Sequence, residues 1–420
     1  MNKDEIKQRI INNFSSLFTF VGPNSSGKSY TLNYLYNTLG NKTLMFDERG
    51  LLKCNVLKSK IIINNDIYIY ENNKNYGAKK EEKYEVEKIS IESTNIIEFI
   101  KKVLYRLPKD NNRLSQGQIK LKGMFEAFLN YNLNNIDYFI FDEPENYLDD
   151  NNLKAIKELF DLLIDNNKKI IFSTHNSRLL ELVKPDIGNI YIFNSYRKDN
   201  INNYSFSDVC DIYEESSKIC KSNKHLSGIS KHKKYWFSAQ PTYRNIYIKI
   251  LIESQEFYRS LFYNKIILLE GKTEELVLRE TKNIIDNLEN VFIANGKYQM
   301  PFLIILFYKI CGNILCVYDS DYKDGKKEQE AYFFNEILIN IKNKYNSIKL
   351  IELKKDLEAT LGIDFSLVAK DLFEDDTLSP NEIKSIKNDY KANIVYYAVR
   401  KDPNLISKLN SIFIKDKWEF

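Results

Sequence analysis

The stretch that decides the fold lies near the start of the chain and reads Gly22-Pro23-Asn24-Ser25-Ser26-Gly27-Lys28-Ser29. This is the G-x-x-x-x-G-K-S pattern of a phosphate-binding loop. The apolar run at 17–21 before it predicts a buried strand, and residues 30–39 after it predict a helix that ends at Gly40. Phosphate binding needs this order, because the loop amides and the helix N-terminus then face the same anion. The sequence therefore predicts a nucleoside triphosphate site.

Each residue type in this loop has a physical task. Glycines at 22 and 27 allow the tight turn that points backbone N–H groups at phosphate oxygens. The ammonium of Lys28 is expected to reach the β- and γ-phosphates, and the hydroxyl of Ser29 is expected to hold Mg²⁺. The residues of this region predicted to bind ATP are Gly22, Asn24, Ser25, Gly27, Lys28, Ser29 and Tyr30.

The composition is typical of a globular protein with two or more domains. The chain has 420 residues, of which 43% are hydrophobic and 28% are charged, and its net charge is +4. Such a weak positive charge neither requires nor excludes a nucleic-acid partner. Five cysteines without a paired C-x-x-C spacing predict reduced thiols. Because no signal peptide or membrane-spanning stretch is evident, we expect a cytoplasmic protein without a membrane partner.

Strands alternate with helices along most of the chain, which predicts α/β folds with parallel sheets. Expected strands lie at 17–21, 43–46, 61–63, 67–70, 138–141, 169–172, 265–269, 291–294, 314–318 and 348–353. Expected helices lie at 30–39, 95–107, 118–129, 153–164, 275–285, 301–310 and 329–341. The charge-dense stretch 78–88 predicts a solvated face. We expect an N-terminal domain over 1–205, a partly helical and basic connector over 206–263, and a C-terminal domain over 264–420.

Further residues of the first part point to ATP hydrolysis. The apolar run at 138–141 ends in Asp142 and Glu143. Asp142 is expected to hold a Mg²⁺-bound water, and Glu143 to orient the attacking water as general base. The stretch Leu114-Ser115-Gln116-Gly117-Gln118 opens a predicted helix, whose N-terminus favours an anion. His175 follows the strand expected at 169–172 and is a candidate for contact with the γ-phosphate.

These motifs, in this order, resemble those of ABC-type ATPases. Residues 114–118 resemble the L-S-G-G-Q signature, with Gln116 in place of the first glycine, and residues 146–149 and His175 fall where that family has its D-loop and its switch histidine. The resemblance implies that Ser115 and Gly117 contact the γ-phosphate bound by a second copy of the chain. It thus implies a homodimer, in which two ATPase domains pair head to tail with ATP at the interface.

One feature of that family is missing. ABC-type domains have a glutamine between the phosphate loop and the signature, and this chain has none between Tyr30 and Ser115. Asp47 and Glu48 are the candidate replacements. The coupling of nucleotide to the rest of the protein is therefore expected to differ from the family pattern.

Carboxylates follow two strands predicted in the second part. Glu270 follows the first strand, Glu274 lies at the start of the next helix, and Asp319 and Asp321 follow a later strand. The carboxyl ends of parallel strands meet at one edge, which is where open α/β sheets have their active sites. Carboxylates gathered there repel one another unless they are neutralised, and hard oxygen ligands favour Mg²⁺ or Mn²⁺. The sequence predicts a divalent metal site at this edge.

The E-G-x-x-E and D-x-D motifs resemble those of the Toprim domain of topoisomerases, primases and related nucleases. An ABC-type ATPase followed by Toprim resembles the layout of the OLD-family (overcoming lysogenization defect) endonucleases, over nearly the whole chain. This resemblance implies metal-dependent hydrolysis of phosphodiester bonds in DNA, in bacterial antiphage defence, alone or with a helicase or a reverse transcriptase. Asn295-Gly296-Lys297 is a further match.

The same resemblance assigns two late residues. It implies that Glu358 completes metal binding and that Lys391 stabilises the scissile phosphate, with Lys387 and Lys401 as nearby alternatives. The catalytic set expected from both domains is Glu143, His175, Glu270 and Lys391, and the metal ligands expected are Ser29, Glu270, Glu274, Asp319, Asp321 and Glu358.

Several alternatives stay open at this point. The same chemistry on RNA, such as tRNA, is one, and an ATP-driven clamp on nucleic acid with an idle Toprim site is another. No tyrosine stands out as a topoisomerase nucleophile, although 29 tyrosines leave that open. The basic segment 218–237 predicts either lysines on a phosphate backbone with Trp236 against a base, or a solvated helix face with a buried tryptophan.

Overall fold

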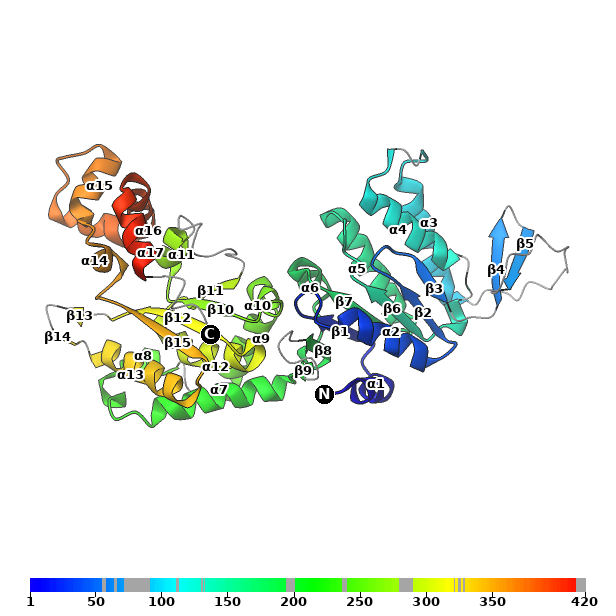
Figure 1. The fold of residues 1–420 in the computed structure, drawn as a ribbon, viewed down its shortest axis with the longest axis horizontal. Coiled ribbons are helices and arrows are strands. Elements are labelled where there is room, and N and C mark those ends of the chain that lie inside the picture. Colours follow the sequence, from blue (N-terminus) through cyan, green and yellow to red (C-terminus); the bar gives the residue numbers. More distant parts are fainter. Residues whose placement is uncertain are drawn as a thin grey trace. The chain divides into compact units, whose positions relative to one another are not determined.

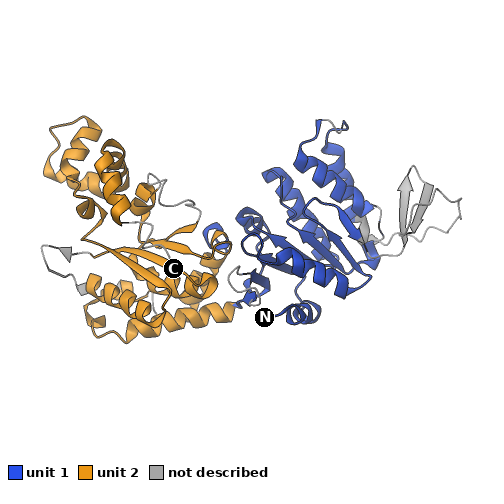
Figure 2. Cartoon of the chain, viewed as in Figure 1, with its two compact units in different colours: residues 1–205, 253–258 blue, residues 206–252, 259–420 orange. Residues whose placement is uncertain are grey.

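The computed structural model describes residues 1–54, 58–63, 66–71, 91–110, 113–129, 131, 133–193, 201–235, 240–278, 290–320, 322–323, 326–327 and 329–412. The chain divides into two compact units, residues 1–205 with 253–258, and residues 206–252 with 259–420 (Figure 2). Residues 206–252, which we expected to form a connector, therefore belong to the second unit. The charged stretch 78–88 lies outside the described residues.

The first unit is built on a mixed seven-stranded sheet in the order β3-β2-β6-β7-β1-β8-β9 (Figure 1). Its inner strands run parallel, and the edge strands β3 and β9 run antiparallel to their neighbours. The strands are β1 (Leu17–Val21), β2 (Thr43–Phe46), β3 (Leu52–Cys54), β6 (Tyr138–Asp142), β7 (Lys169–Thr174), β8 (Ile190–Phe193) and β9 (Ile201–Asn203). A separate antiparallel pair, β4 (Lys58–Ile63) and β5 (Asp66–Glu71), confirms the two strands expected there.

Helices cover this sheet on both faces. They are α1 (Lys3–Asn12), α2 (Lys28–Leu39), α3 (Ile91–Arg106), α4 (Gln116–Leu129), α5 (Asp150–Asp165) and α6 (Ser177–Val183). Because successive side chains of a strand alternate between faces, Ile140 of β6 joins the core under α1 and α2, whereas Phe139 and Phe141 contact Phe128 of α4. Helices packed on both faces thus hold β6, β7 and β1 side by side in the sheet.

Capping residues set two helix starts that the apolar spacing did not give. The helix expected from residue 30 begins at Lys28, directly after Gly27, which has the left-handed φ of 99°. The helix expected from residue 153 begins at Asp150, because the Asp149 carboxylate accepts the N–H of Asn152 and caps the first turn.

The second unit is built on a four-stranded parallel sheet in the order β11-β10-β12-β15. Its strands are β10 (Ile266–Leu269), β11 (Val291–Ile293), β12 (Ile314–Asp319) and β15 (Ile348–Leu353), and β13 (Tyr322–Lys323) and β14 (Lys326–Lys327) form a small separate pair. The helices of this half of the chain are α7 (Phe206–Lys221), α8 (Lys231–Lys234), α9 (Pro241–Ile252), α10 (Gln255–Ser260), α11 (Lys272–Leu278), α12 (Met300–Cys311), α13 (Gln329–Lys344), α14 (Leu357–Leu361), α15 (Phe365–Phe373), α16 (Pro380–Lys401) and α17 (Pro403–Ile412).

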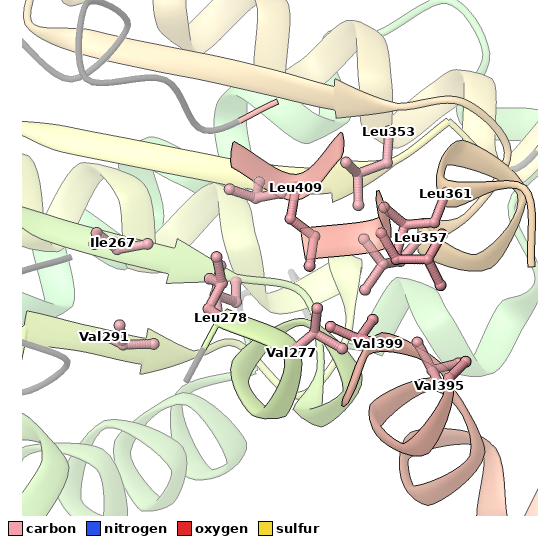
Figure 3. Packing of buried hydrophobic residues seen from close by; sticks show 14 of the residues in the cluster. Ile267, Val277, Leu278, Val291, Leu353, Leu357, Leu361, Val395, Val399 and Leu409 are labelled. Atoms are coloured by element: carbon pink, nitrogen blue, oxygen red, sulfur yellow. The ribbon is translucent and has the colours of Figure 1, made fainter. Parts of the chain in front are cut away.

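A buried apolar cluster packs α14, α16 and α17 against the carboxyl edge of this sheet (Figure 3). Ile267 of β10 and Val277 of α11 belong to the same buried cluster as Leu357 of α14 and Val395 of α16. Glu358 follows Leu357, and Lys391 lies one helical turn before Val395. Burial of these apolar side chains therefore positions both charged groups.

The chain is thus an α/β protein with a mixed seven-stranded sheet and a separate parallel four-stranded sheet, which confirms the predicted fold class at that level. None of the helices in the described part is both long and apolar enough to cross a membrane. Cys210, Cys220, Cys311 and Cys316 are free and buried.

Candidate functional site

The loop predicted to bind phosphate joins β1 to α2. Positive φ angles of 143° at Gly22, 62° at Ser25 and 99° at Gly27 give it the tight turn that the sequence predicts. A side chain at Gly22 would be impossible, since a Cβ there would lie 2.2 Å from the carbonyl oxygen of Phe193. Around this turn the predicted contacts Asn24, Ser25, Ser29 and Tyr30 are exposed.

Lys28 is buried beneath the loop. Its Nζ donates to the carbonyl oxygens of Gly22 at 2.8 Å and Pro23 at 3.1 Å. Burial lowers the pKa of Lys28, although Glu143 and Asp142 act in the opposite direction. The ammonium is therefore held inside the loop, where a bound phosphate would compete with two backbone carbonyls for it.

The two predicted Mg²⁺ contacts lie side by side. The Ser29 hydroxyl donates to Oδ1 of Asp142 at 3.1 Å, and the Ser173 hydroxyl donates to the same oxygen at 2.5 Å. Asp142 ends β6 opposite Ser173 of the neighbouring β7. The sheet register thus brings Asp142 to the start of α2.

Glu143 and His175 form the second predicted pair. His175 Nδ1 lies 3.3 Å from Oε1 of Glu143, and Asn146 Nδ2 donates to the other oxygen at 2.9 Å. The hydrogen bond from His175, with that from Asn146, lowers the pKa of Glu143 to about 2, and the same contact raises the pKa of His175. Glu143 is therefore a carboxylate at neutral pH, as a general base must be.

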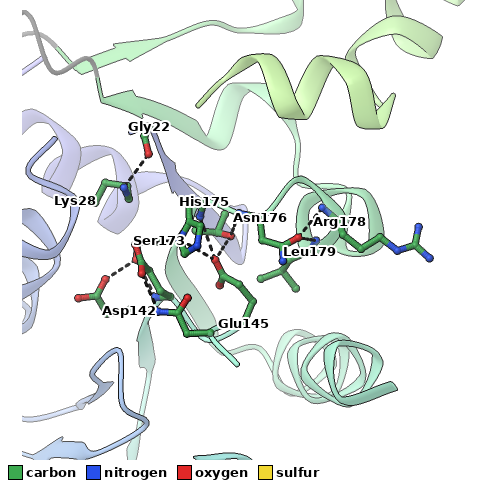
Figure 4. A network of polar contacts seen from close by, with 12 residues as sticks. Gly22, Lys28, Asp142, Glu145, Ser173, His175, Asn176, Arg178 and Leu179 are labelled. Atoms are coloured by element: carbon green, nitrogen blue, oxygen red, sulfur yellow. Dashed lines mark hydrogen bonds and ion pairs between the residues drawn. The ribbon is translucent and has the colours of Figure 1, made fainter. Parts of the chain in front are cut away.

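Sequence reasoning missed Glu145, which organises the loop of His175 (Figure 4). Its buried Oε1 accepts the Thr174 hydroxyl at 2.6 Å and the His175 N–H at 3.1 Å, and it lies 3.6 Å from His175 Nδ1. Burial raises the pKa of Glu145. The signal was present in Asp142-Glu143-Pro144-Glu145, where a second glutamate follows the Asp-Glu pair.

The signature stretch caps its own helix. Ser115 Oγ accepts the N–H of Gln118 at 3.2 Å, and Gln118 Oε1 accepts the N–H of Ser115 at 3.0 Å. This is a reciprocal capping arrangement, and Ser115 stays exposed. Gly117 instead is buried against the loop 146–149, where a Cβ on Gly117 would lie 2.1 Å from the carbonyl oxygen of Tyr147.

Asp47 closes the turn between β2 and β3. Its Oδ1 accepts the N–H groups of Arg49 and Leu51, each at 2.9 Å, whereas Glu48 is exposed. Of the two candidate replacements for the missing glutamine, Asp47 is therefore the one engaged in the local structure.

In the second unit, Glu270 and Asp319 converge from neighbouring strands. Glu270 Oε2 accepts the N–H of Asp319 at 3.1 Å. Lys297, noted above only as part of a sequence match, donates its Nζ to the carbonyl oxygen of Asp319 and lies 3.6 Å from Glu270 Oε2. A buried cation thus neutralises the ends of β10 and β12.

Glu274, Glu358 and Lys391 form the other part of this acidic edge. Glu274 Oε2 accepts the N–H of Gly271 at 3.0 Å, and burial raises the pKa of Glu274. Lys391 Nζ lies 3.1 Å from one carboxylate oxygen of Glu358, and Lys387 Nζ lies 3.4 Å from the other. Burial lowers the pKa of Lys391, but Glu358 and Asp319 outweigh it and raise the value.

These contacts narrow the choice of lysine. Lys401 pairs with Asp371, an exposed aspartate of α15, and so lies away from Glu358. Lys391 and Lys387 share Glu358. The contacts therefore set Lys401 apart and leave Lys391 and Lys387 beside the same carboxylate.

The metal ligands predicted in the second unit fit a hard cation in their chemistry, since all of them are carboxylates. Asp321, one of the predicted set, lies outside the described residues. Among the residues that the structure describes, no three His, Cys, Asp or Glu side chains are grouped so that they would hold a metal ion. The described residues thus include carboxylates, the ligand type that Mg²⁺ prefers, and Glu270 lies beside Asp319. They do not form a group of three side chains placed to hold a metal ion.

The basic segment 218–237 is partly neutralised where it is described. Lys218 lines a pocket of about 330 Å³ together with Asp211, Glu214 and Glu215, and Lys233 pairs with Glu330. Trp236 lies outside the described residues. These contacts resemble a solvated, ion-paired surface more closely than a continuous basic track.

A scan against protein-family models and a search of curated proteins both find no match to this chain.

The close approach of Gly117 to Tyr147 gives a stability prediction. Gly117→Ala is expected to destabilise the protein by about 1–3 kcal/mol, because the added methyl group must push α4 away from the D-loop. Gly123→Ala on the same helix is the matched control, since a Cβ there meets nothing within 4 Å. Thermal unfolding of the two variants checks this: a melting temperature of Gly117→Ala equal to that of Gly123→Ala would contradict the packing described.

Proposed function

We propose that this protein binds and hydrolyses ATP in its first unit and, in its second unit, uses a divalent metal ion to hydrolyse phosphodiester bonds in DNA. The observation that carries the second half is the gathering of charged groups at one edge of a parallel sheet. There the ammonium of Lys391 lies 3.1 Å from Glu358, and Glu270 accepts the N–H of Asp319.

For ATP, each side chain of the first unit has a role that its present contacts support. Lys28 would leave the Gly22 and Pro23 carbonyls for the β- and γ-phosphates, and Ser29 with Asp142 would hold Mg²⁺. Glu143, kept ionised by His175, would accept the proton of the attacking water. His175 would bind the γ-phosphate, steadied by Glu145.

A second copy of the chain is the partner proposed for this unit. Ser115 and Ile119 are exposed at the start of α4, and Tyr147 is exposed on the adjacent D-loop. A polar group beside two large apolar side chains suits an interface that closes over an ATP phosphate. Head-to-tail pairing would supply Ser115 and the N–H of Gly117 to the ATP of the other copy.

In the second unit, Glu270, Glu274, Asp319 and Glu358 would hold Mg²⁺ or Mn²⁺, with Asp321 as a further ligand. The bound cation would supply Lewis-acid stabilisation of the phosphate and an acidified water. Lys391 would neutralise charge that develops on the scissile phosphate. Lys297 would keep Glu270 aimed at the end of β12, as it does in the present structure.

The test is cleavage by the purified whole chain. Supercoiled plasmid and tRNA are each incubated with EDTA, Mg²⁺ or Mn²⁺, with and without ATP. We expect plasmid nicking only with a divalent cation, and a rate that ATP changes. Cleavage of tRNA alone would move the substrate to RNA. Binding of nucleic acid that depends on ATP, without cleavage of any substrate, would replace the nuclease by a clamp.

A further inference from the structure

A lysine of the signature helix reaches the general base. Lys120 is buried on α4, and its Nζ donates to the backbone carbonyl oxygen of Glu143 at 2.7 Å. The proposed roles of Ser115, Gly117 and Glu143 in ATP hydrolysis do not involve this contact. It joins the helix that begins at Ser115 to the residue that is proposed to activate water.

The backbone of Glu143 needs such support. Its φ of 46° is in the left-handed region, which non-glycine residues rarely adopt and which costs free energy unless surrounding contacts hold it. The N–H of Glu143 donates to Ser173, both to its carbonyl oxygen at 3.2 Å and to its hydroxyl at 3.0 Å. With Lys120 on the carbonyl, both backbone polar groups of Glu143 are hydrogen-bonded, the N–H to β7 and the carbonyl oxygen to α4.

A second contact ties the same helix to the same loop. Gly117 is packed so closely on Tyr147 that no Cβ fits between them. Gly50 also packs on Lys120, since a Cβ on Gly50 would lie 2.9 Å from the Lys120 Cγ. A displacement of α4 must therefore displace the loop 143–148 or break the hydrogen bond of Lys120.

We propose that Lys120 is a positioning residue that transmits the state of the signature helix to Glu143, so that ATP hydrolysis depends on what binds at the Ser115 end of that helix. This inference rests on the proposed ATPase function. Signature helix and general base would be coupled by one charged hydrogen bond within each copy of the chain, from Lys120 Nζ to the Glu143 carbonyl oxygen.

The charges around Lys120 make the coupling sensitive to pH. Burial lowers the pKa of Lys120 to about 8, even though the carboxylates that face it act in the opposite direction. Those carboxylates are Glu145, Glu143, Asp47 and Asp142. As pH rises through about 8, the ammonium loses its charge and its hydrogen bond to the Glu143 carbonyl weakens. Turnover of ATP is expected to fall over that range.

The test compares Lys120→Met with Lys122→Met in the whole chain. Lys122 lies on the same helix and pairs with Glu126, so its loss removes an equal charge without touching Glu143. We expect Lys120→Met to lower kcat for ATP by about tenfold to a hundredfold with the Kd for ATP changed less than about twofold. Lys122→Met is expected to leave both unchanged. Wild-type kcat in Lys120→Met would overturn the proposal.

A pH profile covers the case in which Lys120→Met does not fold. Wild-type kcat should decline above about pH 8, and Lys120→Arg, which keeps its charge, should lose that decline. Because Lys28 contacts ATP directly, its titration would raise the Kd instead. A flat wild-type kcat profile would overturn the role of Lys120. Absence of ATP binding by the wild type would overturn the proposed ATPase function itself, so the two failures are distinct.

Discussion

Replacing Lys28 with alanine is expected to weaken ATP binding by at least about a hundredfold, because the lost ammonium is the charged donor of the phosphate-binding loop. In the present structure this ammonium donates hydrogen bonds to two carbonyl oxygens of the loop itself, those of Gly22 and Pro23. Equilibrium titration with a fluorescent ATP analogue measures the change. Binding of Mn²⁺ by the second unit, followed by electron paramagnetic resonance, should be retained.

The control for this prediction is Lys169→Ala. Lys169 also donates to backbone carbonyls, those of Ile10, Ile11 and Asn13. It lies at the start of β7, whereas Thr174, beside the proposed ATP site, lies at the end of that strand. Its loss should reduce stability and leave ATP affinity unchanged. Equal loss of ATP and Mn²⁺ binding in Lys28→Ala would mean that the two sites have been assigned wrongly.

Asp319→Ala is expected to lower the rate of DNA cleavage by at least about a hundredfold, since it removes a carboxylate from the edge where the cation is proposed to bind. Asp319 is buried at the end of β12, and its N–H fixes Glu270. The alanine variant keeps that N–H. A loss of cleavage with unchanged melting temperature would therefore report on the carboxylate itself.

Glu352→Ala provides the matched carboxylate for comparison. Glu352 is exposed on β15, where it pairs in register with Tyr318, the residue before Asp319. Its removal should leave cleavage at the wild-type rate. If both variants cleaved like the wild type on every substrate, the acidic edge would have no catalytic role.

Much of the framework could be predicted from local sequence. The strands expected at 17–21, 43–46 and 348–353 are present with those limits, because a short apolar run between turn residues favours a buried parallel strand. The tight turn at residues 22–29 was equally predictable, since Gly22 and Gly27 can adopt the positive φ angles that other residues rarely do. Ser29 and Asp142 lie close together because Ser29 follows β1 and Asp142 ends β6, and these two strands run parallel in one sheet.

The charged residues that hold the sites in place were not predictable in the same way. Lys120 and Lys297 look like ordinary surface lysines in the sequence, and only tertiary packing shows that they are buried. The partner of Lys120 is 23 residues away, on another element. Likewise the spacing of the last lysines did not separate Lys391 from Lys401, which lie on the same helix but pair with different carboxylates.

Anomalous diffraction at the manganese edge, from crystals of the whole chain grown with Mn²⁺, can locate the divalent cation that we propose the second unit binds between its carboxylates. We expect a manganese peak bounded by Glu270 and Asp319, with Glu274 or Glu358 turned toward it. If no peak lay there and Lys297 still contacted Glu270 and Asp319, the proposed metal-dependent cleavage would be wrong.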